Sequence, residues 1–236
     1  MPRLASVLVA EAIGTFLFFF VGIGAVVLGS FTGDTSGGLI GVAFAHGLAL
    51  AVMVSALGAV SGGHFNPAVT FGVWLTGRIE PGRAALYIVA QLVGGVAAAL
   101  AVRAVFPESA WQPVAIGTPA VADGISVTGA IIVEAILTMV LVTAVFGTAI
   151  DPRAPKLGGL AIGLAVAVDI MMGGTLTGAA MNPARWFGPA AVSGNWANGY
   201  VWVIGPLLGA AVAALFYRYV LLPEADLDRT PAEPTA

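Results

Sequence analysis

The chain has 236 residues, of which 59% are hydrophobic and only 9% are charged, far fewer charges than soluble domains carry. It contains no cysteine, which excludes disulfides, thiol catalysis and cysteine metal sites. The formal net charge is only −3, and no basic run indicates nucleic-acid binding. The high hydrophobic fraction and the low charged fraction together indicate an integral membrane protein.

Six segments are long and apolar enough to cross a bilayer as helices. In chain order they are residues 5–28, 38–60, 84–106, 126–149, 157–174 and 199–222. The first has no small-residue cleavage site after a short apolar core, so we expect a retained helix and not a signal peptide. The chain thus divides into one transmembrane domain, residues 1–222, and an acidic tail, 223–236, that we expect to be disordered.

The basic residues predict the orientation in the membrane. With the N-terminus in the cytoplasm, only Arg103 faces outward, and Arg185 lies at membrane depth. The cytoplasmic side then carries Arg3, Arg78, Arg83, Arg153, Lys156, Arg218 and Arg229. We therefore expect both termini in the cytoplasm, and a cell (plasma or inner) membrane as the location.

The tripeptide Asn-Pro-Ala occurs twice, as Asn66-Pro67-Ala68 and Asn182-Pro183-Ala184, at a separation of 116 positions. The same ungapped offset aligns HGLALAVMV with IGLAVAVDI, and the spans around Glu11 and Glu134 also correspond. Each half therefore holds three spans, with repeat one over about 5–106 and repeat two over about 126–222. Because three is odd, the second half must be inverted in the membrane relative to the first.

Each Asn-Pro pair is expected to begin a short helix, because asparagine is a favoured N-cap and proline is favoured at the first helical position. About ten residues follow Pro67 before Gly77, and a similar number follow Pro183 before Ser193, too few to span a bilayer. Such half-helices exist at membrane depth only where they line a wet cavity or are buried in protein. Entering from opposite faces, their positive N-terminal ends should meet near the middle.

With these motifs, the chain resembles the aquaporins of the major intrinsic protein family. The resemblance rests on AEAIGTF, SGGHFNPAVT, TGAAMNPARWFG and the three-plus-three repeat, and it extends to about Leu222. It implies an all-α membrane bundle of six transmembrane helices and two re-entrant half-helices, usually in a homotetramer with one pore in each subunit. It also implies a passive channel for water or small uncharged solutes, with no enzyme activity, cofactor or metal.

The resemblance further implies which residues line the pore. Asn66 and Asn182 would donate hydrogen bonds to water at the centre, while the positive helix ends would repel protons and other cations. A second ring, the selectivity filter, would consist of His46, Ile170, Ala179 and Arg185. Typical strict water channels have an aromatic at the position of His46 and a histidine at that of Ile170. The pattern here is similar to some plant vacuolar members that also pass ammonia, urea or hydrogen peroxide.

Three alternatives for the function differ in weight. A broader facilitator of glycerol and small neutral solutes is disfavoured, because the glycerol-conducting branch usually has Asp after the arginine, where Trp186 stands here. An ion-coupled secondary transporter shares inverted repeats and broken helices. An intramembrane enzyme has the least support, because the chain contains two histidines and no Gly-x-Ser-x-Gly or Asp-Asp motif.

Other polar residues are expected at membrane depth. Glu11 and Glu134 are repeat-equivalent acids that, in this family, mainly hold the loop backbones from behind, and a proton relay is the alternative. His64 either supports its loop or lines the cytoplasmic vestibule. Asp169 replaces a usually small residue beside the ring, and it either reaches the outer surface or bonds Arg185 or His46.

Overall fold

A computed structural model describes residues 3–34, 37–155, 157 and 159–223. Six of its helices are long and apolar enough to cross a membrane. They are α1 (Leu4–Thr32), α2 (Gly38–Ser61), α4 (Pro81–Val105), α6 (Val127–Val145), α7 (Leu160–Thr177) and α9 (Val201–Phe216), with π-helical turns η2 (Phe146–Ile150) and η3 (Tyr217–Leu221) extending α6 and α9. The predicted all-α membrane bundle is confirmed. Lys156 and the predicted disordered tail, apart from its first residue, lie outside the described residues.

The first and fifth spans end more than one residue later than the sequence predicts. The first was expected to end at residue 28, but α1 continues to Thr32, where Gly33 adopts a left-handed φ of 63° and bonds the carbonyl of Gly29. The fifth was expected over 157–174, but α7 ends at Thr177, and Gly178 (φ 82°) terminates it in the same way. In both cases a glycine in the left-handed conformation caps the end of the helix.

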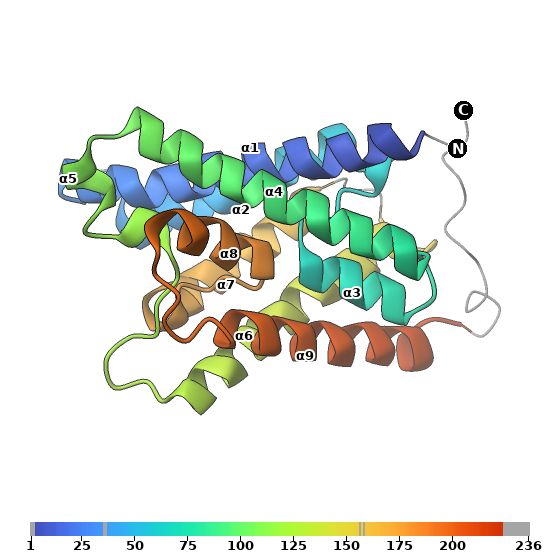
Figure 1. Ribbon diagram of the computed structural model, residues 1–236. Helices are drawn as coiled ribbons and strands as arrows, with labels where there is room; N and C mark the ends of the chain where they lie inside the picture. Colours follow the sequence, from blue (N-terminus) through green and yellow to red (C-terminus); the bar gives the residue numbers. More distant parts are fainter. Residues whose placement is uncertain (1–2, 35–36, 156, 158, 224–236) are drawn as a thin grey trace.

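The two predicted half-helices are α3 (Pro67–Leu75) and α8 (Pro183–Ser193). The N-cap side chain of Asn66 accepts a hydrogen bond from the amide of Ala68 at 2.8 Å. Asn182 accepts one from the amide of Ala184 at 3.0 Å. Their N-termini meet inside the bundle, and α3 runs toward the end where α1 begins while α8 runs toward the opposite end (Figure 1). This is the inverted arrangement that the repeat predicts.

Helix packing follows the repeat. In the first half α1 packs against α2 and α4, and in the second half α6 packs against α7 and α9. The halves meet where α2 packs against α7, and there the repeat-related residues Gly47 and Gly163 face each other. A Cβ atom on Gly47 would lie 2.6 Å from the carbonyl oxygen of Gly163, so the backbones approach too closely for a side chain.

The connection between α4 and α6 folds back over the end of the bundle opposite the N-terminus (Figure 1). It contains a short helix, α5 (Glu108–Trp111), and a 3₁₀ turn, η1 (Ala115–Gly117). η1 contacts both α1 and α8, and Ile116 within it is buried with a left-handed φ of 54°. This unusual backbone brings the carbonyl of Gly117 to α8, beside the site described below.

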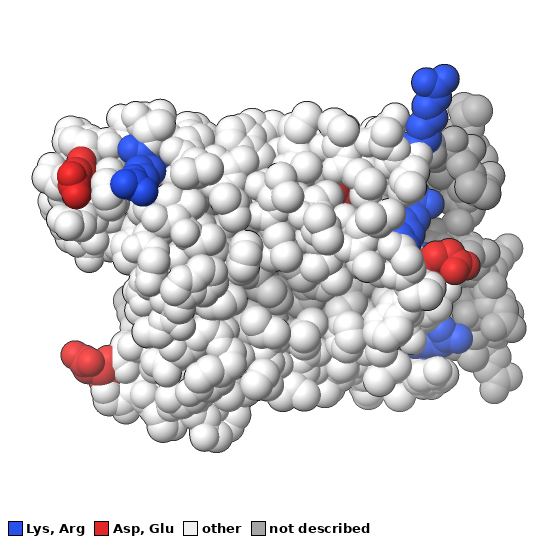
Figure 2. All heavy atoms as spheres, in the orientation of Figure 1, with Lys and Arg blue, Asp and Glu red and all other residues white. Residues whose placement is uncertain are grey.

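The outer surface fits a lipid environment. Figure 2 shows that most charged side chains on the visible face gather at the two ends, and that the broad band between them is uncharged apart from one small acidic spot. Large apolar side chains are exposed along the long helices, for example Val9 and Ile13 on α1 and Ile132 and Ile136 on α6. Such a belt matches the hydrocarbon core of a bilayer.

Candidate functional site

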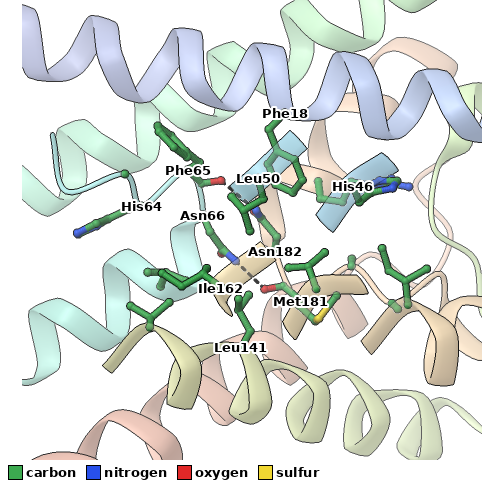
Figure 3. A pocket seen from close by; sticks show the side chains of 18 of the residues that line it. Phe18, His46, Leu50, His64, Phe65, Asn66, Leu141, Ile162, Met181 and Asn182 are labelled. Carbon is green, nitrogen blue, oxygen red and sulfur yellow. Dashed lines mark hydrogen bonds between the residues drawn. The ribbon is translucent and has the colours of Figure 1, made fainter. Parts of the chain in front are cut away.

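A narrow cavity lies where the two half-helices meet, and Figure 3 shows the side chains around it. Its volume is about 30 Å³, which is room for about two water molecules. A wider vestibule of about 380 Å³ opens from it on the side of η1. His46, Ile170 and Arg185 line both spaces, so they stand at the junction between them.

The two N-cap asparagines hold each other's loops. Nδ2 of Asn66 donates to the carbonyl of Met181 at 2.9 Å, and Nδ2 of Asn182 donates to the carbonyl of Phe65 at 3.0 Å (Figure 3). Each amide carries a second hydrogen, and both asparagines line the cavity. The arrangement therefore presents two rigidly held donors to whatever occupies the cavity.

The carboxylate of Glu11 supports the loop before α3. Its Oε1 accepts from the amide of His64 at 3.0 Å, and its Oε2 accepts from the amide of Phe65 at 2.8 Å. Side chains of Ser61 and Gln91 also donate to it, at 2.6 and 2.8 Å. The acid is fully buried and surrounded by donors, as a buried carboxylate requires.

Glu134 does the same for the loop before α8. It accepts from the amides of Ala180 at 3.0 Å and Met181 at 2.7 Å, and from the hydroxyl of Thr177 at 2.7 Å. Met181 has a φ of 52° and its repeat mate Phe65 a φ of 46°, both in the left-handed region that such residues avoid. The two carboxylates therefore hold strained turns that aim the asparagines into the cavity.

Arg185 and His46 are joined by a hydrogen bond. Nε of Arg185 donates to Nε2 of His46 at 3.1 Å, and its Nη1 donates to the carbonyl of Gly117 at 2.8 Å. Nδ1 of His46 lies 2.9 Å from the carbonyl of Val42, which can only accept, so Nδ1 carries the proton. The imidazole is thus held as the tautomer whose Nε2 lone pair faces the guanidinium. Ala179, the fourth residue expected in the ring, lines the narrow cavity beside them.

His64 lies in the loop before α3 and is one of the residues around the cavity. Its ring lines the cavity, and its Nδ1 lies 3.1 Å from the hydroxyl of Thr70. That hydroxyl donates its only hydrogen to the carbonyl of Asn66, so His64 must be the donor in their contact. Its amide also bonds Glu11, so the residue supports the loop as well.

Asp169 follows neither alternative proposed for it. Its side chain is buried, with 3% of the residue exposed, and it bonds neither Arg185 nor His46. Gly173, one turn later on the same face of α7, packs against Leu137 of α6. The face that carries Asp169 is therefore turned toward α6. Its Oδ2 has no hydrogen-bond partner among the described residues.

Residue type alone does not identify several apolar side chains as lining the cavity, because an apolar side chain on a helix usually packs in a core. The repeat offsets identify them, since repeat-related positions line the same cavity. These pairs are Phe18 with Leu141, His46 with Ile162, Leu50 with Val166, and Val69 with Arg185. No sequence signal identifies the carbonyl of Gly117, which depends on the fold of the connection. Within the described ranges, no cluster of three or more His, Asp and Glu side chains is placed to hold a metal ion.

A profile of the family described as "Major intrinsic protein" matches residues 2–217. The chain belongs to this family. Among its relatives, the "Probable aquaporin TIP3-2" of Arabidopsis thaliana is 44% identical, covering 92% of this chain and 84% of the relative. "Aquaporin TIP4-4" of Zea mays is 43% identical, covering 96% and 90%. Members of the major intrinsic protein family are channels, so this protein is a multi-pass membrane channel for water and small solutes and not an enzyme.

A comparison with solved structures gives the same fold. The aquaglyceroporin from Plasmodium falciparum superposes with a TM-score of 0.83 at 25% sequence identity, covering 95% of this chain and all of that one. The major intrinsic protein fold, six spans and two re-entrant half-helices, is thus shared over nearly the whole length.

Proposed function

We propose that the protein conducts water passively in single file and excludes protons and other ions. The observation that carries this proposal is the pair of cross-bonded asparagines, Asn66 and Asn182, at the helix N-termini in a cavity of about 30 Å³. A water molecule there accepts a hydrogen bond from each free amide hydrogen, so its oxygen points to both asparagines. Its own hydrogens then point outward, which interrupts the alignment that proton transfer along a water chain needs.

Charge adds a second barrier to cations. Each half-helix N-terminus carries about half a positive elementary charge, and both point at the same cavity. Arg185 is permanently charged and lines the cavity at its junction with the vestibule. A hydronium ion would meet these charges in succession, while a neutral water would not be repelled.

The ring of His46, Ile170, Ala179 and Arg185 acts as the selectivity filter in this proposal. Arg185 occupies the Nε2 acceptor of His46, and the side chains of Ile170 and Ala179 are apolar. The arginine is then the main polar contact for a solute, and the resemblance of the ring to that of some plant vacuolar members supports passage of ammonia, urea or hydrogen peroxide. We therefore propose water as the main solute, with slower passage of these small neutral molecules.

Glu11, Glu134 and His64 are proposed as structural supports of the loops. Both oxygens of Glu134 accept backbone amide hydrogens, and both oxygens of Glu11 do the same. Donors from the loops thus occupy both oxygens of each acid, as expected of a residue that holds a loop in place. This favours loop support over the proton relay.

The proposed assembly is a homotetramer whose subunits each contain one pore within residues 1–222. Arg3, Arg78, Arg83 and Arg218 support a cytoplasmic location of the end where α1 begins, as the positive-inside rule predicts. We propose a cell (plasma or inner) membrane with both termini in the cytoplasm.

A stopped-flow comparison of water, ammonia, urea and glycerol in proteoliposomes tests the proposed function. We expect water to be the fastest, ammonia and urea to exceed empty vesicles, and glycerol to stay near them. His46→Phe and Ile170→His should lower urea and ammonia flux relative to water flux. An unchanged solute profile would contradict the ring assignment, and saturable, proton-dependent uptake would contradict a channel.

A further inference from the structure

We propose that Gly22 of α1, which does not line the cavity, sets the width of the constriction by leaving room for the imidazole of His46. Gly22 is then a positioning residue that determines solute specificity through another side chain. The inference rests on the proposed function of the ring and adds a residue that the ring itself does not contain.

The contact between Gly22 and His46 leaves no room for a side chain. Gly22 is buried, and a Cβ atom built on it would lie 2.5 Å from Nε2 and 2.7 Å from Cγ of His46. Real Cβ atoms do not approach other atoms so closely. His46 lines both the narrow cavity and the vestibule, while Gly22 lines neither. The imidazole therefore stands between Gly22 and the path of the solute.

The imidazole has no easy way to move aside. Its Nδ1 is bonded to the carbonyl of Val42, its Nε2 accepts from Arg185, and the ring of Phe18 packs against it edge-on with centroids 6.1 Å apart. After Cδ2, the ring atom nearest to a Cβ atom on Gly22 is Nε2, the same atom that accepts from Arg185. A methyl group at residue 22 would thus push the ring toward the cavity and disturb its bond to Arg185.

The second half of the molecule supports this interpretation. The offset that relates Glu11 to Glu134 makes Val145 the counterpart of Gly22. The offset of 116 between the two Asn-Pro-Ala motifs makes Ile162 the counterpart of His46. Both Val145 and Ile162 line the cavity with their own side chains. In the first half the side chain at the α1 position is missing, and the imidazole occupies the space behind the constriction. The two halves therefore line the cavity differently, because the first half has Gly22 next to His46 where the second half has the two side chains of Val145 and Ile162.

The test compares Gly22→Ala with Gly24→Ala in proteoliposomes, measuring water and urea flux by stopped flow. Gly24 lies on the same helix, but a Cβ atom there would have only Val102 nearby, at 4.0 Å, so this variant is the control. We expect Gly22→Ala to lower water permeability roughly tenfold, equivalent to about 1.4 kcal/mol in the barrier, and to lower urea flux more. Gly24→Ala should behave like the parent protein. Equal fluxes in all three proteins would overturn the proposal.

A double variant separates this effect from helix packing. Removing the imidazole in His46→Ala should widen the ring and raise urea flux, and adding Gly22→Ala to it should then change nothing. If the added methyl group lowers flux by the same factor with and without the imidazole, Gly22 acts on packing and the inference is wrong.

The same variants distinguish failure of the inference about Gly22 from failure of the proposed function. If His46→Ala leaves the water-to-urea ratio unchanged, the ring assignment itself fails. If Gly22→Ala does not assemble, the double variant remains decisive, because it should reach the membrane as His46→Ala does. A double variant that also fails to assemble would contradict the proposal.

Discussion

Nδ2 of Asn66 donates to the carbonyl oxygen of Met181 at 2.9 Å, so a residue of the first repeat holds the loop of the second. Asn182 returns the same bond to Phe65 at 3.0 Å. Each asparagine also caps its own half-helix through its side-chain oxygen. The two side chains proposed to contact water are therefore also the ones that connect the two halves at the pore centre.

Replacement of Asn66 by aspartate tests this double role. The carboxylate can still cap α3, but it has no hydrogen for Met181, whose buried carbonyl then loses its partner at a cost of about 1–3 kcal/mol. We expect Asn66→Asp to lower water permeability to near that of empty vesicles and to lower the melting temperature. Asn198→Asp, at an exposed loop position, is the matched control and should change neither quantity. Normal water flux through assembled Asn66→Asp protein would contradict the role assigned to the amide.

Glu134→Gln should loosen the loop before α8. Glutamine retains one acceptor oxygen and places an amide group against the N–H of Ala180 or Met181, at a cost of about 2 kcal/mol. Because Met181 is in a left-handed conformation, we expect the loop to relax and both melting temperature and water flux to fall. Glu80→Gln, at the N-cap of α4 where the side chain makes no capping bond, serves as the control. A Glu134→Gln protein as stable as the parent would show that the carboxylate does not hold the turn.

The repeat accounts for what the sequence could predict. Asn-Pro pairs with strong local signals at a fixed offset predicted both half-helices, and the same repeat pointed to Glu11 and Glu134, which bond the amides of Phe65 and Met181. The bond between His46 and Arg185 was not predicted, because it joins residues of different helices whose side-chain directions depend on packing.

Other features depend on tertiary contacts that the sequence does not indicate. The space that Gly22 provides for His46 is visible only once α1 and α2 are packed. The burial of Asp169 was missed because its helix is apolar nearly all round, so periodicity does not identify which face turns to α6.

Acid should weaken the end of the bundle where α1 begins. Asp151, just after η2, accepts from Nε and Nη2 of Arg153 at 2.9 and 2.6 Å and from the hydroxyl of Tyr217 at 3.1 Å. The hydrogen bonds from Arg153 lower the pKa of Asp151 to about 2. Since the folded pKa lies below the unfolded value, this stabilisation is present above about pH 4 and is lost as the pH falls through about 2.

Asp151→Asn should therefore lower the melting temperature at pH 7 and lose this difference from the parent near pH 2. The expected loss at pH 7 is about 1 kcal/mol, because the Arg153 side chain is 54% exposed and its charge is screened by water. Thermal melts across this pH range measure it, with the exposed Asp123→Asn as a control that should not differ from the parent. A difference in melting temperature that grows as the pH falls would show that the predicted direction of the pH dependence is wrong.

Mercurial reagents should leave water flux unchanged, because the chain contains no cysteine. Ala179→Cys places a thiol in the narrow cavity, and a bound mercury atom there should block water until a reducing thiol removes it. Ala197→Cys, in an exposed loop outside the cavity, should bind mercury without losing flux. Strong, reducible inhibition of the parent protein would contradict the prediction.

Osmotic shrinkage of proteoliposomes that contain a pH-sensitive dye tests the central proposal most directly. We predict shrinkage that is much faster than in empty vesicles, with a low activation energy, while an imposed proton gradient persists as long as it does in empty vesicles. Shrinkage no faster than in empty vesicles, or a proton gradient that collapses as water moves, would contradict the account.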